Sequence, residues 1–176
     1  MSDYSIPLSV PSLKGNEWKY VKECIDTEWV SSSGKYVDLF EQKIAEYTGS
    51  KYAIACVNGT SALHLALVEA GISDSDEVLL PSLTFISTAN IVLYERAKPV
   101  LTECNPRTYN ISLQDAERRI TDKTKAIIPV DMNGMPADYD EILIFADKHG
   151  LKVIADSAES LSAIYKGRKT GAIAPI

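Results

Sequence analysis

The sequence predicts an α/β fold with a mainly parallel sheet and helices on both of its faces. Its strand-like segments are apolar at most of their positions, which is typical of strands buried on both faces. Most of these segments are followed by a helix-like segment of about ten residues, the pattern of repeated strand–helix units. The length of 176 residues, with 45% hydrophobic and 24% charged residues, suits a compact domain with its own core.

The first elements along the chain are helical. Residues 16–27 carry apolar side chains at helical spacing, and Asn16 is a candidate N-cap. A serine-rich loop at residues 31–34 separates this helix from a second one, which ends at Gly49.

From residue 52 onward, apolar strands alternate with helices. We expect strands at residues 52–57, 77–80, 99–102, 126–130 and 152–155, and helices at residues 62–70, 87–96, 111–120 and 138–149. Gly150 closes the last helix, and residues 165–171 indicate a hairpin or loop. Because a doubly wound sheet rarely ends in a loop without a closing helix, we expect the chain to be truncated.

Composition and charge disfavour several classes of protein. The formal net charge of -6 is spread along the chain without a basic stripe, so we expect no nucleic-acid binding. Three separated cysteines and two histidines indicate neither a disulfide framework nor a zinc site, and Asp131, Asp138 and Asp140 lack a supporting set of metal ligands. The sequence contains no apolar run of about 18 residues and no evident secretory signal. We therefore expect a reduced, cytoplasmic protein that does not enter a membrane.

The first candidate binding segment is Asn58-Gly59-Thr60-Ser61, between a predicted strand and a predicted helix. Ligands of open parallel sheets bind beyond the carboxyl ends of the strands, and the backbone N–H groups that begin a helix bind phosphate. Gly59 would let the backbone approach a ligand closely. An ordinary helix N-cap by Thr60 or Ser61 explains the same residues.

Two further candidate segments follow predicted strands. Phe85 can stack on a flat heterocycle, although burial in a core accounts for most phenylalanines. Asp156 can accept a hydrogen bond from a protonated ring nitrogen, as a carboxylate does for the pyridine of pyridoxal 5'-phosphate (PLP), or it can cap a helix. Glu159 lies three residues later. His64 is either a group near the phosphate or a half-buried structural residue, and His149 suits the last turn of its helix.

Taken together and in this order, these motifs resemble those of the DegT/DnrJ/StrS family of PLP-dependent nucleotide-sugar aminotransferases. The resemblance covers nearly the whole chain. Its motifs are Trp29-Val30-Ser31-Ser32-Ser33-Gly34, Asn58-Gly59-Thr60-Ser61-Ala62-Leu63, Pro81-Ser82-Leu83-Thr84-Phe85-Ile86-Ser87-Thr88-Ala89-Asn90, Gly134-Met135-Pro136-Ala137-Asp138, Val153-Ile154-Ala155-Asp156-Ser157-Ala158-Glu159 and Tyr165-Lys166-Gly167-Arg168. Six motifs in order identify a family far more specifically than any one of them.

The resemblance implies the large domain of a fold-type I PLP-dependent transferase, which works as a homodimer with its active site at the subunit interface. By position, Gly59, Thr60 and Ser61 would hold the phosphate of PLP. Phe85 would stack on the pyridine ring, and Asp156 would pair with the ring nitrogen.

The resemblance also implies how the chain is divided. Residues 1–35 would form an N-terminal helix and a substrate and dimer loop, with Ser31 and Ser32 as substrate-binding residues. Residues 36–176 would form an incomplete PLP-binding large domain without the small C-terminal domain. Glu159 stands where the family often has Gln or His beside the phenolic oxygen of the cofactor. A carboxylate is unfavourable there unless it is protonated or turned away.

The implied activity transfers an amino group from glutamate to a nucleotide-linked keto sugar, for cell-surface polysaccharide or lipopolysaccharide precursors. The Schiff-base lysine of the family would lie beyond Ile176, because Lys166 and Lys169 belong to the preceding loop. We therefore expect no catalytic residue in this chain, no transaminase activity from it alone, and poor solubility from uncovered apolar surface. Three alternatives stay open: a PLP-dependent sugar dehydratase of the same family, a non-catalytic truncated product or binding module, and a Rossmann nucleotide-binding domain, which the lack of Gly-x-Gly-x-x-Gly disfavours.

Overall fold

The computed structural model describes residues 10–176 of the chain. The chain divides into two compact units, one up to Leu39 and one from Phe40 onward, and each is described by itself. The predicted domain of residues 1–35 begins outside the described part of the chain. Its boundary and its role therefore stay a prediction.

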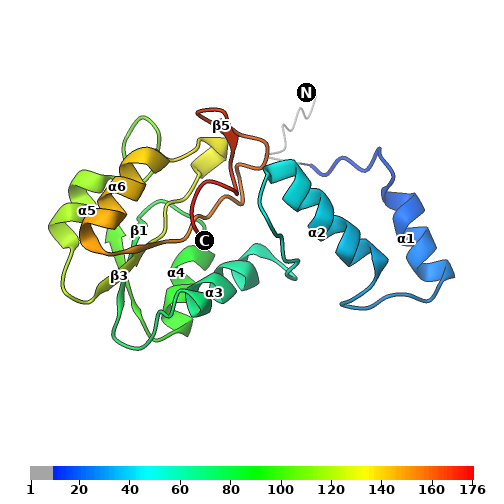
Figure 1. The fold of residues 1–176 in the computed structure, drawn as a ribbon, viewed down its shortest axis with the longest axis horizontal. Coiled ribbons are helices and arrows are strands. Elements are labelled where there is room, and N and C mark those ends of the chain that lie inside the picture. Colours follow the sequence, from blue (N-terminus) through cyan, green and yellow to red (C-terminus); the bar gives the residue numbers. More distant parts are fainter. Residues whose placement is uncertain (1–9) are drawn as a thin grey trace, which may run out of the picture. The chain divides into compact units, whose positions relative to one another are not determined.

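The first unit contains a helix with no buried side chain. Helix α1 (Glu17–Asp26) buries no residue, and α2 (Lys35–Thr48) begins in this unit (Figure 1). Both helices lie where the apolar spacing predicts them. Asn16 precedes α1 as expected, but its side chain makes no capping hydrogen bond. Gly49, with φ at 84°, follows the end of α2.

The second unit is built on a parallel sheet of four strands in the order β2-β1-β3-β4. The strands are β1 (Glu77–Pro81), β2 (Lys98–Thr102), β3 (Thr124–Ile127) and β4 (Lys152–Val153). In the register of the sheet, Leu79 of β1 lies opposite Val100 on one side and Ile127 on the other. Every residue of β1 is buried, because this strand has a neighbour at both edges and helices on both faces.

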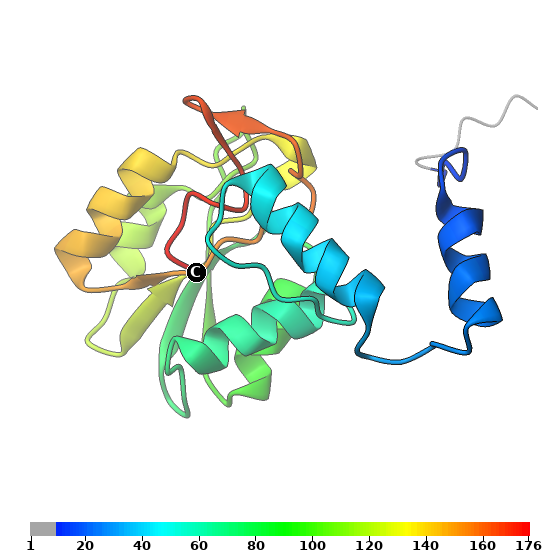
Figure 2. The same cartoon turned by 45° about the vertical axis from the view of Figure 1, so that its right-hand side comes forward.

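Helices cover both faces of the sheet, as Figures 1 and 2 show. They are α3 (Gly59–Glu69), α4 (Ser87–Tyr94), α5 (Leu113–Arg119) and α6 (Tyr139–His149). Leu79 and Ile127 belong to a core with residues of α5 and α6, whereas Val78 and Ala126 belong to a core with residues of α3 and α4. Successive strand residues point to opposite faces, so each strand contributes to both cores. The predicted α/β architecture is confirmed.

The end of the described chain forms a short antiparallel hairpin of β5 (Ile164–Tyr165) and β6 (Arg168–Lys169). Lys166 and Gly167 connect the two strands with φ angles of 47° and 84°. Two consecutive residues with positive φ make a tight turn that matches the twist of a hairpin. Of the hairpin and the loop that the sequence allows here, the structure has the hairpin.

The predicted strand at residues 52–57 is wrong. These residues form no strand and join no sheet within the described part of the chain, and Tyr52, Ile54 and Val57 are 73%, 72% and 87% exposed. The backbone N–H of Ala55 donates instead to the Glu41 carboxylate at 2.8 Å. An apolar segment predicts a strand only as far as a neighbouring strand is present to accept its backbone hydrogen bonds, and no described segment does so.

Two other strands are shorter than predicted. The ladder predicted at residues 126–130 ends at Ile127, and the one at 152–155 ends at Val153. Beyond these points, the two chains keep only an isolated parallel bridge between Val130 and Asp156. Backbone hydrogen bonds still join the two segments there, from the N–H of Asp156 to the Pro129 carbonyl at 2.9 Å and from the N–H of Asp131 to the Asp156 carbonyl at 3.0 Å, so the apolar sequence continues past the last regular pair. Within residues 10–176, no helix has the length and apolar character needed to cross a membrane.

Candidate functional site

A cavity of about 350 Å³ lies in the second unit, beyond the carboxyl ends of the strands. Segments that are far apart in the sequence meet here, because parallel strands end at the same edge of the sheet. The cavity is lined by Asn58, Gly59, Thr60, Leu63, Phe85, Ser87, Val130, Asp156, Ala158 and Glu159. Five of the six residues predicted to bind a cofactor are in this set, and Ser61 is the one that is not.

The segment that begins α3 presents polar groups to the cavity. Asn58 is the N-cap, and its side chain accepts a hydrogen bond from the N–H of Ser61 at 2.9 Å. The alternative in which Thr60 or Ser61 caps the helix is therefore wrong, because α3 begins at Gly59, three residues before the predicted start at Ala62. Within the described residues, the hydroxyls of Thr60 and Ser61 have no hydrogen-bond partner, and the N–H groups of Gly59 and Thr60 have no acceptor, whereas that of Ser61 is bound to Asn58.

Gly59 leaves open space beside the backbone at this point. A Cβ added at Gly59 would meet no atom within 4 Å, so packing within the chain does not require glycine. The unfilled volume belongs to the cavity that Gly59 and Thr60 line. A ligand phosphate can therefore approach the N-terminus of α3 closely, where the helix dipole favours negative charge.

Phe85 lies on the loop between β1 and α4 and is 70% exposed. The alternative in which Phe85 is buried in the core is wrong. The backbone explains this position, because the Phe85 carbonyl accepts a hydrogen bond from the N–H of Thr88 at 3.1 Å as the chain turns into α4. The ring therefore lies beyond the strand end, at the cavity and outside both cores.

Asp156 follows β4 and is only 6% exposed. Its Oδ2 accepts a hydrogen bond from the hydroxyl of Thr88 at 2.8 Å, and its Oδ1 accepts one from the N–H of Ala158 at 3.3 Å. The alternative in which Asp156 caps a helix is wrong, because turns and a hairpin, and no helix, follow it through Ile176. The bond to Ala158 is the side-chain turn that aspartate forms with a residue two positions later.

Glu159 lies at the rim of the same cavity. Its Oε2 accepts a hydrogen bond from the backbone N–H of Asn133 at 2.7 Å. Asn133 has a left-handed backbone with φ at 51° inside the 3-10 turn η1 (Met132–Gly134), which aims its N–H at the carboxylate. One carboxylate oxygen of Glu159 is therefore already bound to the protein backbone.

Asp131 is a buried carboxylate whose role the sequence does not reveal. Its oxygens accept hydrogen bonds from Tyr139 Oη at 2.9 Å, Ser157 Oγ at 2.9 Å, Ser160 Oγ at 2.7 Å and the N–H of Ala137 at 2.8 Å. Burial and then the charge of Asp131 raise the pKa of Tyr139 above its ordinary value of 10.0. Among the residues described, no group of three or more His, Cys, Asp or Glu side chains is placed to hold a metal ion. Asp131 instead joins the loop after β3 to the loop after β4.

The two histidines have structural contacts. His64 is half-buried, with Nε2 2.5 Å from Glu95 Oε1 and its ring against Tyr94 at 5.6 Å. This contact supports the structural alternative for His64, which does not line the cavity. His149 lies 2.9 Å from Glu117 in the last turn of α6, where the sequence places it.

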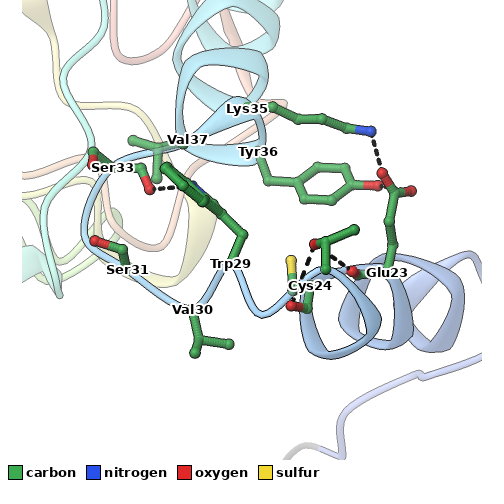
Figure 3. Close-up of a pocket in the computed structure, with 11 residues that line it drawn as sticks. Glu23, Cys24, Trp29, Val30, Ser31, Ser33, Lys35, Tyr36 and Val37 are labelled. Carbon is green, nitrogen blue, oxygen red and sulfur yellow. Dashed lines mark hydrogen bonds and ion pairs between the residues drawn. The ribbon is translucent and has the colours of Figure 1, made fainter.

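The first unit holds a separate cavity of about 690 Å³ (Figure 3). Ser31 lines it and Ser32 does not, so the structure separates the two residues predicted to bind substrate. The indole N–H of Trp29 donates to the Ser33 carbonyl at 2.9 Å. A Cβ at Gly34 would lie 1.8 Å from Trp29 Nε1, so the loop requires glycine at this position.

An ion pair lines the other side of this cavity. Glu23 accepts a hydrogen bond from Tyr36 Oη at 2.6 Å and pairs with Lys35 (Figure 3). The hydrogen bond from Lys35, followed by that from Tyr36, lowers the pKa of Glu23 below its ordinary value. These polar groups therefore satisfy one another within the first unit.

Comparison with known proteins identifies relatives along nearly the whole chain. The sequence model of the DegT/DnrJ/EryC1/StrS aminotransferase family matches residues 11–176. A GDP-perosamine synthase of Caulobacter vibrioides is 51% identical over 98% of this chain and 47% of its own length. The chain thus spans about half the length of this curated relative.

Solved structures agree with the sequence comparison. An aminotransferase from Psychrobacter cryohalolentis superposes with a TM-score of 0.90 at 39% identity, over 96% of this chain and 43% of its own. A Streptococcus pneumoniae protein solved in a PLP form superposes with a TM-score of 0.92 at 27% identity, over 97% of this chain and 47% of its own. The predicted fold class and family resemblance are confirmed.

Proposed function

The chain belongs to the DegT/DnrJ/EryC1/StrS aminotransferase family, and from this premise we propose that it forms the PLP-binding part of an enzyme that transfers an amino group from glutamate to a nucleotide-linked keto sugar. The observation that carries the proposal is the cavity at the strand ends, where five residues predicted from three separate motifs meet. The name of the Caulobacter vibrioides relative supports a nucleotide-linked amino sugar as the product.

The donor groups of the cavity fit the parts of the cofactor. The N–H groups of Gly59 and Thr60 and the hydroxyl of Thr60 would bind the phosphate, with the hydroxyl of Ser61 beside them. Phe85 stacks on one face of the pyridine ring, and Asp156 accepts a hydrogen bond from the ring nitrogen. When it is bound, PLP supplies an electron sink for bond cleavage at the amino-bearing carbon. Asp156 keeps the ring nitrogen protonated for that purpose.

We place Glu159 at the edge of the cofactor ring. Its bond to the N–H of Asn133 occupies one carboxylate oxygen and holds the side chain toward the loop after β3. This contact is what allows a carboxylate to stand near a phenolic oxygen without close like-charge repulsion.

Ser31 and Ser32 contact the sugar substrate in the complete enzyme.

The Schiff-base lysine lies outside residues 1–176 in this proposal. Lys166 Nζ donates to Asp140 at 2.6 Å, and this contact raises its pKa above the ordinary value of 10.5. A lysine must lose its proton to act as a nucleophile or base, so the contact with Asp140 disfavours that role. The ammonium of Lys169 lies over the ring of Tyr47 at 3.6 Å. We therefore expect the 176-residue chain alone to have no transaminase activity.

The complete enzyme is proposed to be a homodimer. The described residues of the first unit include Trp18, Val21 and Ile25 on α1, which are 73%, 52% and 60% exposed. A helix that buries none of its residues gains stability when a partner covers its apolar side chains.

The dehydratase alternative depends on a residue outside this chain, and no contact among residues 10–176 favours it.

Binding of pyridoxamine 5'-phosphate, measured by equilibrium dialysis, tests the proposed cofactor site. This form carries an amine in place of the aldehyde, so it cannot form a Schiff base with surface lysines. We expect the chain to bind it, and Phe85→Ala to weaken binding about three- to tenfold through lost stacking. Leu83→Ala is the matched control, because Leu83 is exposed on the same loop and does not line the cavity.

Two results would contradict the proposal. The first is that the unmodified chain does not bind pyridoxamine 5'-phosphate, and the second is that both variants weaken binding equally. The expected lack of activity needs a separate assay, in which the loaded chain is mixed with a nucleotide-linked keto sugar. Formation of an amino sugar in a single turnover would show that a residue of this chain replaces the missing lysine.

A further inference from the structure

Two threonines connect the loop of Phe85 to the carboxylate of Asp156. The hydroxyl of Thr84, on that loop, lies 2.9 Å from the hydroxyl of Thr88 on α4. Thr88 in turn lies 2.8 Å from Asp156 Oδ2. Thr88 is fully buried at 0% exposure, so water does not compete for its hydroxyl. None of the sequence motifs assigns a role to either hydroxyl.

The chemistry of the three groups sets the direction of these hydrogen bonds. An ionised carboxylate only accepts, and a hydroxyl has one proton to donate. Thr88 therefore donates to Asp156 and accepts from Thr84, which makes Thr84 the donor of the first bond. Each bond polarises the next in such a chain. The negative charge of Asp156 thus orders the hydroxyls as far as the loop that carries Phe85.

These bonds also fix how the carboxylate is turned. Oδ2 is bound to Thr88, and Oδ1 has the longer contact of 3.3 Å with the N–H of Ala158. A carboxylate offers about four lone-pair sites, so acceptor sites remain on the side that lines the cavity. Without Thr88, rotation of the carboxyl group would no longer be restricted by a charge-assisted bond.

We propose that Thr88 is a positioning residue that orients the Asp156 carboxylate toward the cofactor ring nitrogen. Thr84 links this orientation to the loop of Phe85 through its hydrogen bond with Thr88. The inference rests on the proposed function, because it requires Asp156 to face a pyridine nitrogen. Its physical basis is that a ring held between Phe85 and Asp156 needs both groups at a set separation. The two hydroxyls connect the loops that carry these groups.

The test compares two probes in the same protein: pyridoxamine 5'-phosphate and its 1-deaza analogue, in which C–H replaces the ring nitrogen. The analogue keeps the phosphate and the aromatic face but offers nothing to Asp156. We expect the unmodified chain to prefer pyridoxamine 5'-phosphate. Thr88→Val, which preserves shape and removes the hydroxyl, should weaken that probe about tenfold and the analogue by less than about twofold.

Three further variants complete the series. Thr88→Ser should restore the preference, because it returns the hydroxyl, and Thr84→Val should weaken pyridoxamine 5'-phosphate about threefold. Thr102→Val is the matched control. Thr102 is 1% exposed and donates to the Leu80 carbonyl on the neighbouring strand, so its removal should leave the affinity for both probes unchanged.

The outcomes separate this inference from the function on which it rests. If Thr88→Val weakens both probes equally, or leaves the preference intact, Thr88 is only a packing residue and the inference is overturned while the cofactor site stands. If the unmodified chain binds both probes equally well, Asp156 does not face the ring nitrogen, and the inference is overturned together with that role of Asp156. If the unmodified chain binds neither probe, the proposed function itself is wrong.

Discussion

Removal of the Asp131 carboxylate should destabilise the fold strongly, although Asp131 does not line the cavity. The variant Asp131→Ala leaves four donors without their acceptor. The Ser160 hydroxyl also lies 3.3 Å from the Ser157 carbonyl and can turn to it, and Ser157 is half-buried and within reach of water. The hydroxyl of Tyr139 and the N–H of Ala137 belong to fully buried residues, and among the described residues each is hydrogen-bonded to Asp131.

The magnitude follows from these two donors. A buried donor without an acceptor costs about 1–3 kcal/mol, so the pair costs about 2–6 kcal/mol. Removing the buried charge of Asp131 also removes the desolvation cost of that charge, which offsets part of the loss. We therefore expect a loss of unfolding free energy near the middle of this range, at about 3–4 kcal/mol. Domains of this kind unfold with about 5–15 kcal/mol, so the variant should retain its fold with much reduced stability. Asp131→Asn, which keeps one acceptor oxygen, should lose about 1–2 kcal/mol.

Urea unfolding followed by circular dichroism measures the loss, provided that the slope with denaturant stays constant between variants. Asp122→Ala is the control, since Asp122 is exposed and its side chain makes no hydrogen bond to the described residues. The control should change the unfolding free energy by less than about 0.5 kcal/mol. A loss below about 1 kcal/mol for Asp131→Ala at an unchanged slope would refute the reasoning, because it would mean that the buried donors find other partners.

Three further predictions concern pH and packing. The pKa of Tyr139 in the folded state is raised above 10.0, so its contribution to stability is present below that pH and is lost as pH rises above it. Tyr139→Phe should therefore flatten the alkaline part of the curve of unfolding free energy against pH. An unchanged slope there would contradict the assignment. The pKa of Glu77 is lowered below 4.5, first by its contact with Lys98, so its contribution is present above pH 4.5 and is lost as pH falls below it. Glu77→Gln should remove that acid-side dependence, whereas a curve like that of the unmodified chain would argue against it. Gly34→Ala should displace the Trp29 indole and increase the acrylamide quenching of Trp29 in a single-tryptophan background; equal quenching in both proteins would show that the loop adapts without cost.

The elements that the sequence predicts well are those whose neighbours are supplied by the same repeated pattern. The segment at 77–80 is apolar at three of its four positions, and it forms the buried central strand β1. Helix α6 ends at His149, and Gly150 caps it in the left-handed conformation with φ at 65°, which glycine adopts at low cost. The segment 52–57 is apolar at every position, yet it forms no ladder among the described residues, because pairing requires a partner strand that local sequence does not encode.

The candidate site shows the same division. Local rules give each of Thr60, Phe85 and Asp156 two interpretations, because a cap, a core position and a ligand contact can use the same residue type. The fold excludes the helix-cap and core alternatives through contacts between residues distant in sequence. One example is the hydrogen bond between Thr88 and Asp156, which are 68 positions apart. Thr88 and Asp131 are missed for this reason. A threonine in the apolar helix α4 and an aspartate directly after an apolar strand were the available signals.

The sequence by itself determines the α/β class, the family and most helix and strand positions of this chain. Hydrophobic periodicity and turn residues act over a few positions, and the chain records them directly. Tertiary structure alone decides that Gly59, Phe85 and Asp156 share one cavity, that Asn58 caps α3, and that Asp131 collects four donors. These facts depend on which strands are neighbours and where each one ends, and such geometry arises only when the whole sheet is packed.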